Sequence, residues 1–253
     1  MINKNKLNSS ALRLSKHGIQ ILRKCLYNID FLKIINEILI HKKMISKYIK
    51  KNSQSEGVLN LMHPKYKEIC KLLVKVSKLE IIKKYFNTKL IINSISAVML
   101  FPNKPGFKHG HKWHYDGRYY HNNIKADHLV AAIPITLFGV KNGATKYKIK
   151  LKNKIKIIQP ELIPSDVCLF DARIIHKSGL NKSMEPRVLV TIVFTPPHIK
   201  PIFNYKNNFI NYKKNINKDM KQLLGFYSEI PKNLREFYLH PEKRPFRKSQ
   251  MII

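Results

Sequence analysis

The sequence predicts a mainly β protein, an antiparallel sandwich or jelly roll with flanking helices. Before about residue 90, apolar residues recur three and four positions apart, as they do along one face of a helix. After residue 90, short runs of β-branched and aromatic residues alternate with clusters of Pro, Gly and Asn. No long helix separates these runs, which disfavours a parallel βαβ sheet and favours antiparallel strands.

Three helices are expected in the first third of the chain. The first spans about residues 10–27 and the second about residues 31–50, with apolar side chains on one face and lysines opposite. Residues 51–57 form a polar break. Pro64 suits the first turn of a third helix that runs to Leu79. All three apolar stripes should support the sheet rather than bind a cofactor.

Five later segments are predicted as strands. They are LIINSISAVMLF, HLVAAIPITLF, KYKIKLKNKIKII, DVCLFDARIIH and RVLVTIVF. These strands should form a core over residues 90–197, preceded by helical support in 1–89. Residues 198–253 form a mixed extension with a short helix near 219–228 and a basic tail. A length of 253 residues fits one domain, 1–253.

The chain is strongly basic, with 48 Lys and Arg against 15 Asp and Glu and a formal net charge of +33. Hydrophobic residues make up 44%, enough to build a core, which excludes a charge-dominated disordered chain. Two interpretations of the charge stay open. It reflects codon drift with solvated lysines, or a preference for anionic partners such as phosphates, nucleic acid, anionic lipid or acidic glycan.

Three cysteines, Cys25, Cys70 and Cys168, are far apart and form no CxxC pair. A disulfide framework or a cysteine-rich zinc site is therefore not expected. The N-terminal residues lack the apolar run and cleavage site of a secretory signal, and no stretch approaches about 20 apolar residues. A cytoplasmic protein without a membrane span is expected.

A candidate metal site begins in the segment KWHYDGRYY. His114 and Asp116 are two residues apart, so on an extended strand both side chains project from one face. The best third ligand is His176, at the end of the apolar strand VCLFDARII. Two imidazoles and one carboxylate on one side of an iron(II) ion leave adjacent positions for a 2-keto acid and dioxygen.

A candidate anion site lies downstream. After the turn-like residues 179–186, an antiparallel return should bring Arg187 back towards Ser178 on the ligand side of the sheet. An inward arginine in an apolar strand is costly unless an anion meets it. The distal carboxylate of 2-oxoglutarate suits a two-pronged guanidinium contact.

These motifs resemble the phytanoyl-CoA dioxygenase-like family of iron(II)/2-oxoglutarate-dependent oxygenases. In that family an HxD motif is followed by a distal His, by Ser or Gly two residues later and by Arg eleven residues later. The segment HKSGLNKSMEPR has His176, Ser178 and Arg187 at those offsets, and Asn181 and Ser183 match the family's N-x-S. Together with HYD, these offsets make the resemblance specific.

Two more segments extend the resemblance to about residues 90–196. They are Pro105-Gly106 and NGATKY at 142–147, which resemble the family's Pro-Gly and Asn-Gly-x-Thr segments. The chain departs from the family where a Pro-Gly-Ser-His loop often follows, because the basic run KIKLKNKIKII stands there instead. Since that loop often borders the substrate, the pocket is expected to be more open or more positively charged.

The resemblance implies a double-stranded β-helix, cupin-like in form. It implies a dioxygenase that hydroxylates a small-molecule or carrier-linked substrate and releases succinate and CO2. His114, Asp116 and His176 would be the catalytic iron ligands, and Arg187 and Ser178 would bind the co-substrate 2-oxoglutarate.

The basic run also predicts a cationic strand face. Its lysines all have even numbers, so on a single strand they would lie on one side. They are Lys146, Lys148, Lys150, Lys152, Lys154 and Lys156. This face is either solvated or contacts an anionic substrate or carrier.

Several residues keep two interpretations. His109 and His111 could bind zinc or line the pocket rim. Trp113 could be a core aromatic or a pocket wall. Asp166 and Asp171 could support the metal ligands or hold turns.

Asn142 and Thr145 could contact the co-substrate or stabilise a turn. Two rival functions also remain. One is a basic jelly roll that binds nucleic acid or another polyanion without catalysis. The other is a cupin-type metal enzyme that needs no keto acid.

Overall fold

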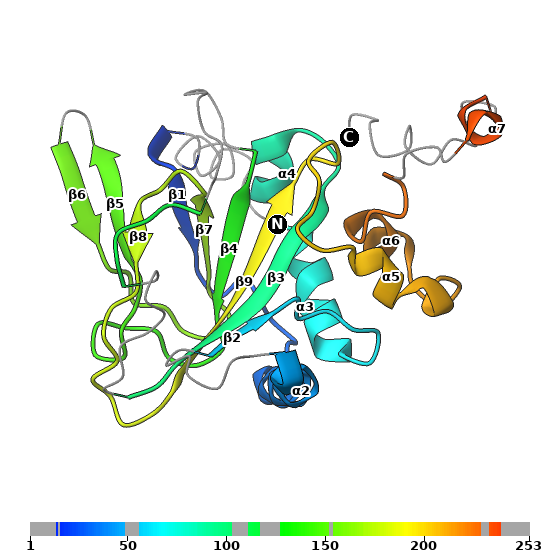
Figure 1. Ribbon diagram of the computed structural model, residues 1–253. Coiled ribbons are helices and arrows are strands. Elements are labelled where there is room, and N and C mark those ends of the chain that lie inside the picture. The colour runs from blue at the N-terminus through cyan, green and yellow to red at the C-terminus, as the bar shows by residue number, and fades with distance from the viewer. Residues whose placement is uncertain are drawn as a thin grey trace.

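The computed structural model describes residues 14, 16–48, 56–102, 111–116, 127–151, 154–228 and 233–238. In this part of the chain two antiparallel sheets face each other, and helices cover the outer face of the larger sheet (Figure 1). The predicted class, a mainly β jelly roll with flanking helices, is confirmed.

The larger sheet has six strands in the order β1-β7-β4-β9-β3-β2, and the smaller has three in the order β6-β5-β8. The strands of the larger sheet are β1 (Ile19–Leu22), β2 (Glu56–Leu59), β3 (Ile91–Leu100), β4 (Leu129–Pro134), β7 (Val167–Asp171) and β9 (Arg187–Thr195). The strands of the smaller sheet are β5 (Lys146–Leu151), β6 (Lys154–Ile158) and β8 (His176–Lys177). Every pairing is antiparallel, which suits a sheet built from consecutive short runs.

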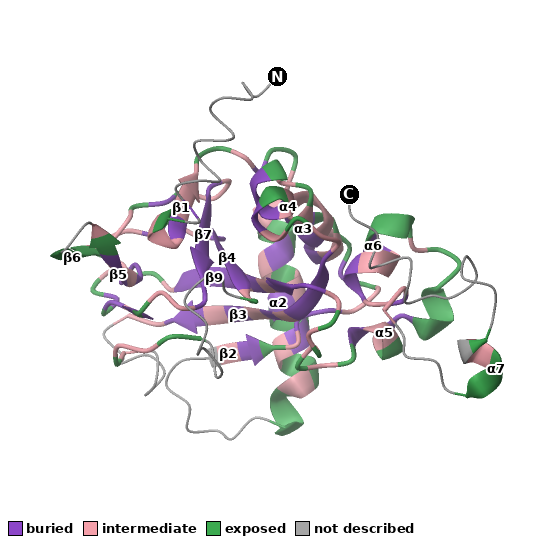
Figure 2. Cartoon of the chain, turned by 90° about the horizontal axis from the view of Figure 1, so that it is seen from above, coloured by how far each residue is buried: buried purple, intermediate pink, exposed green. Residues whose placement is uncertain are grey.

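Alternation along the central strands creates two cores. In β4, Ala131 packs on the helix side, whereas Val130 and Ala132 pack towards the smaller sheet. In β9, Val190 packs on the helix side and Leu189 on the other. Since both faces of the larger sheet are covered, its central strands are almost wholly buried, as the purple ribbons of Figure 2 show.

The described chain has six α-helices; all but the last pack on one side of the larger sheet, and the last lies apart from it (Figure 1). They are α2 (Phe31–Ile45), α3 (Lys67–Ser77), α4 (Glu80–Phe86), α5 (Tyr205–Asn208), α6 (Lys218–Leu223) and α7 (Leu234–Phe237). Asp30 caps α2 by accepting the amide hydrogen bond of Lys33. Glu37 of α2 accepts the amides of Glu68 and Ile69, which begin α3. No described helix is long and apolar enough to span a membrane.

The expectation of one helix over residues 10–27 holds only at its start, where Leu14, Lys16 and His17 are helical. Gly18 adopts a positive φ of 71°, and Ile19–Leu22 then forms β1 at the edge of the larger sheet, paired with β7. Residues 10–13 and 15 lie outside the described part. The polar break also ends earlier than expected, since Glu56–Leu59 is the edge strand β2. The first third therefore supplies strands as well as helical support.

The other helix predictions are confirmed with shifted ends. The helix expected over 31–50 is α2 followed by a 3-10 turn, Ser46–Tyr48, and residues 49–50 are outside the description. Pro64 precedes α3, which begins at Lys67, and a separate helix, α4, follows it. The helix expected near 219–228 is α6.

Two predicted strands are divided. KYKIKLKNKIKII forms a hairpin of β5 and β6. DVCLFDARIIH leaves the larger sheet after Asp171, turns, and enters the smaller sheet as β8. His176 therefore does not end an apolar strand but begins a new strand in the opposite sheet, because the chain must cross between the layers there.

Candidate metal centre

His114 and His176 are held opposite each other by the backbone, with their rings tilted by 51°. The amide of His114 donates to the carbonyl oxygen of His176 at 3.0 Å, and the amide of His176 donates back at 2.8 Å. This antiparallel bridge places the ring centroids 4.4 Å apart. The amide of Asp116 donates to the carbonyl of Ala172 at 3.2 Å, which fixes the third residue beside them.

Both imidazoles direct the same nitrogen into the site. The Nδ1 atom of His114 lies 2.9 Å from the carbonyl oxygen of Lys112, and that of His176 lies 2.9 Å from the carbonyl oxygen of Ile174. A carbonyl only accepts hydrogen bonds, so each Nδ1 carries the proton and each Nε2 keeps a free lone pair. This tautomer is the one that binds a metal through Nε2.

The carboxylate of Asp116 completes the group. Its Oδ1 atom lies 3.8 Å from Nε2 of His114 and 3.7 Å from Nε2 of His176. Adjacent donors bound at about 2.1 Å to one ion lie roughly 3 Å apart, so small side-chain movements would close this group on a divalent ion. Among the residues that the structure describes, no other three His, Cys, Asp or Glu gather in this way.

Burial prepares His176 to act as a ligand. Its side chain is one-tenth exposed, between the ring of Phe170 at 4.9 Å and that of Tyr147 at 6.0 Å. This burial lowers the pKa of His176, against the opposing influence of Asp116, so the imidazole stays neutral. A neutral imidazole is the form that coordinates a metal.

Arg187 lies buried near one end of the inter-sheet core. It is only 1% exposed, and its guanidinium lies 4.9 Å from the ring centroid of Phe138. It donates to the carbonyl of Gly143, while its Nε atom has no hydrogen-bond partner. Burial lowers its pKa to about 10, so it remains cationic at neutral pH.

No described carboxylate lies within ion-pair distance of Arg187. A buried cation with an unused donor is unfavourable unless an anion binds to it. The site therefore fits a ligand that carries a carboxylate.

Tyr147 was not predicted as a site residue. It is completely buried on the inner face of β5, where its hydroxyl is hydrogen-bonded with Thr145 and Cys168. Burial raises the pKa of Tyr147 well above its ordinary value, and the charge of Arg187 opposes this. The alternation of lysines with apolar residues in KYKIK was the available signal, because it points Tyr147 inwards.

The structure separates Ser178 from Arg187 more than expected. Ser178 follows β8 of the smaller sheet and Arg187 begins β9 of the larger sheet, so no antiparallel return joins them. The amide of Gly179, next to Ser178, donates to the carbonyl of Gly143, which also accepts Arg187. Ser178 is half-buried beside this shared carbonyl.

Hydrogen bonds indicate structural roles for several residues that had two possible roles. Asn142 holds a turn, since it accepts the amide of Gly139 and donates to the carbonyl of Leu137, both at 2.6 Å. Asp166 accepts hydrogen bonds from Arg23 and from two backbone amides.

Asp171 bonds to Arg173 and to the hydroxyl of Tyr85, away from the metal group. His111 joins no group of three potential ligands in the described chain. His109 and Pro105-Gly106 lie outside the described residues.

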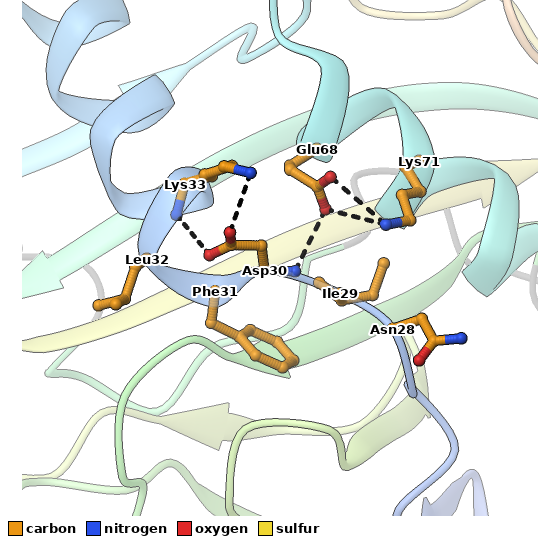
Figure 3. A pocket seen from close by; sticks show the side chains of 8 residues that line it. All are labelled: Asn28, Ile29, Asp30, Phe31, Leu32, Lys33, Glu68 and Lys71. Atoms are coloured by element: carbon orange, nitrogen blue, oxygen red, sulfur yellow. Dashed lines mark hydrogen bonds and ion pairs between the residues drawn. The ribbon is translucent and has the colours of Figure 1, made fainter.

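A surface hollow of about 650 Å³ lies elsewhere, beside the start of α2 (Figure 3). Its polar groups bind one another: Glu68 accepts the amide of Asp30 and pairs with Lys71, while Asp30 pairs with Lys33. None of the metal-site residues lines this hollow, and its charged side chains pair with one another.

No protein-family model matches the chain. Uncharacterized proteins of Mycobacterium tuberculosis and Mycobacterium bovis are 32% identical to it over 85 residues, which is 32% of this chain. The aligned stretch spans about 30% of the length of those relatives.

Solved structures resemble the chain over most of its length. The α-ketoglutarate-dependent epimerase SnoN from nogalamycin biosynthesis is 15% identical with a TM-score of 0.57, covering 76% of this chain and 84% of SnoN. AviO1 from Streptomyces viridochromogenes Tue57 is 14% identical with a TM-score of 0.59, and the match covers 77% of this chain and 96% of AviO1. A second SnoN structure holds Fe3+ and α-ketoglutarate. It is 12% identical with a TM-score of 0.53, and the match covers 76% of this chain and 84% of that SnoN chain. The chain therefore has the fold of these proteins.

Proposed function

We propose that the chain is an iron(II)/2-oxoglutarate-dependent oxygenase of the phytanoyl-CoA dioxygenase-like type. The convergence of two imidazole Nε2 atoms on one carboxylate oxygen carries the proposal. The bound iron and α-ketoglutarate of SnoN, which shares this fold, support the same pair of groups here.

His114, Asp116 and His176 would hold the iron. The backbone carbonyls of Lys112 and Ile174 hold both rings through Nδ1, with their Nε2 atoms directed into the site. Bound iron and 2-oxoglutarate would supply the activation of dioxygen, with succinate and CO2 as products.

Arg187 would bind the distal carboxylate of 2-oxoglutarate through its Nε, which has no hydrogen-bond partner, and through a second N–H group of its guanidinium. Thr145 and Tyr147 place hydroxyls in the same buried region. The rings of Phe138, Phe170 and Tyr147 keep water away, which strengthens the charged contact.

The proposed reaction is hydroxylation of a small-molecule or carrier-linked substrate in the cytoplasm. The protein's part is to hold the substrate's C–H bond beside the metal, where the one-third exposed side chain of His114 and the 39% exposed side chain of Asp116 leave the centre accessible. A polyanion-binding protein without catalysis would not need a buried arginine that lacks a counter-ion.

Anaerobic titration tests the proposal. Adding iron(II) and 2-oxoglutarate together should give a metal-to-ligand charge-transfer band, and neither alone should give it. Succinate should then form when oxygen and a substrate are admitted. Iron binding without any effect of 2-oxoglutarate would favour the cupin-type alternative, and absence of iron binding would leave the non-catalytic alternative.

A further inference from the structure

The smaller sheet has a cationic outer face. Residues directly opposite in antiparallel strands lie on the same face, and the register pairs Lys146 with Lys177, Lys148 with Ile157 and Lys150 with Ile155. The cationic face consists of Lys146, Lys148, Lys150, Ile155, Ile157 and Lys177. The opposite face carries Tyr147 and His176, so the cationic face lies behind the metal centre.

The hairpin splits the predicted lysine row. Lys154 and Lys156 of β6 lie opposite Leu151 and Ile149, on the other face of the sheet. The expectation that all the even-numbered lysines share one face is therefore wrong, and Lys152 is outside the described residues.

The charge of this face is not compensated within the described chain. None of its four lysines lies within ion-pair distance of a described carboxylate. Lys146 and Lys177 are direct cross-strand neighbours, an arrangement of like charges that destabilises a sheet. The ring of Trp113 lies 4.8 Å from the Nζ of Lys177, which partly offsets this repulsion. Trp113 thus packs on the outer face, in neither the core nor the pocket wall.

Aliphatic side chains accompany these cations. Ile155 is 72% exposed and Ile157 is 54% exposed, although isoleucine is among the residues most often buried. Both lie on β6, which pairs with β5 alone among the described strands and lies at the margin of the described chain in Figures 1 and 2. The face therefore combines ammonium groups that have no described carboxylate partner with exposed hydrocarbon on a projecting hairpin.

We propose that the cationic face docks on an anionic lipid surface. Its isoleucines would enter the boundary between headgroups and acyl chains, while the flexible lysines reach the phosphate and carboxylate groups of the headgroups. The formal charge of +33 attracts the whole chain to such a surface.

Two other occupants fit less well. Single-stranded nucleic acid is bound mainly through aromatic stacking and a charged groove. The aromatic ring described on this face, Trp113, already contacts Lys148 and Lys177, and the exposed apolar side chains, Ile155 and Ile157, are aliphatic. A second copy would bring two faces of the same charge together and would repel.

Sedimentation of the full chain with vesicles tests the proposal. The chain should bind vesicles that contain phosphatidylserine and not vesicles of phosphatidylcholine alone, and added salt should weaken binding. The variant Lys148→Gln/Lys150→Gln/Lys177→Gln should bind roughly a hundredfold more weakly, at about fivefold for each lysine. Ile155→Ser/Ile157→Ser should also weaken binding, at unchanged charge.

The matched control is Lys43→Gln/Lys214→Gln/Lys218→Gln, which removes three exposed lysines elsewhere. It should retain most of the binding, and circular dichroism should show every variant folded. An equal loss in the control would overturn the proposal, because binding would then follow net charge alone. Failure to bind phosphatidylserine vesicles would overturn it too, as would an effect of the lysine variant confined to a single-stranded oligonucleotide.

Discussion

Arg187 donates a hydrogen bond to the carbonyl oxygen of Gly143, and that carbonyl also accepts the amide of Gly179 at 3.2 Å. Arg187 begins β9 of the larger sheet, and Gly143 lies just before β5 of the smaller one. This contact therefore joins the two sheets at the proposed co-substrate site. Gly143 has a φ of +79°, and a Cβ there would lie 2.8 Å from the carbonyl oxygen of Gly179.

Gly143→Ala should consequently loosen the co-substrate site. The new methyl group must displace the backbone at Gly179, and a side chain strains the positive φ, for a total of about 1–3 kcal/mol of stability. The apparent affinity for 2-oxoglutarate should fall, while iron affinity changes little. Gly225→Ala is the matched control, since Gly225 has a φ of +81° with nothing within 4 Å of its Cβ position. Equal effects of both substitutions on 2-oxoglutarate titrations would contradict the role of Gly143.

Arg187→Ala should raise the Km for 2-oxoglutarate strongly. Removal of one partner from a buried charge-assisted contact costs on the order of 2–5 kcal/mol. Arg187→Lys keeps the charge without the planar fork, so it should restore only part of the affinity. Succinate formation as a function of 2-oxoglutarate concentration measures both variants, with iron binding as the internal control. An unchanged Km in Arg187→Ala would remove this residue from the site.

Asp116→Ala should abolish both tight iron binding and substrate-coupled succinate formation. Asp116 is the single carboxylate of the group, and two imidazoles alone hold iron(II) less firmly. Asp127→Ala, at an exposed carboxylate close along the chain, is the control and should behave like the unmodified chain. Normal iron affinity in Asp116→Ala would show that the metal group is assigned wrongly.

Asp166 should make the free energy of unfolding depend on pH. Burial acts to raise its pKa, but hydrogen bonds from the Lys24 amide, the Arg23 side chain and the Ile163 amide hold the pKa below its ordinary value. Because the folded pKa is lower than the unfolded one, this stabilisation is present above the unfolded pKa of about 3.9 and is lost as the pH falls through the folded pKa.

Asp166→Asn should therefore lower the free energy of unfolding by about 1–3 kcal/mol at neutral pH. The difference from the unmodified chain should shrink as the pH falls below about 4. Urea unfolding at several pH values measures this. Asp219→Asn removes a half-exposed ion pair with Lys78 and should have little effect. A difference that stays constant with pH would argue against the linkage.

The grouping of the candidate metal ligands could be predicted from the sequence, whereas the path of the chain could not. His114 and Asp116 were placed by their spacing, and Arg187 by its position in an apolar strand. His176 comes close to them although its strand was assigned wrongly, because the turn after Asp171 carries it into the opposite sheet. That turn depends on Asp171 bonding to Arg173 and Tyr85, contacts between segments that periodicity does not reveal.

The hairpin of β5 and β6 shows the same limit. No Gly or Pro marks a turn in KYKIKLKNKIKII, so the run looks like one strand. In the structure Leu151 pairs with Lys154, and this register puts odd positions of β5 opposite even positions of β6. β1 was missed for a related reason, since four residues are too few to separate a strand from a helix by periodicity.

Lys146→Glu should stabilise the fold and leaves the contact of Lys177 with Trp113 in place. It replaces the like-charge pair of Lys146 and Lys177 by an ion pair between directly opposite residues, a change worth about 0.2–1 kcal/mol. The melting temperature should rise at low ionic strength, and the gain should shrink in high salt. Lys214→Glu makes the same change in net charge at an exposed position outside the sheets, so it corrects for the relief of overall repulsion. If both variants stabilise equally, the effect belongs to net charge rather than to the cross-strand pair. A larger gain for Lys146→Glu, combined with weaker vesicle binding, would mean that the cationic face lowers stability in favour of its contact with an anionic surface.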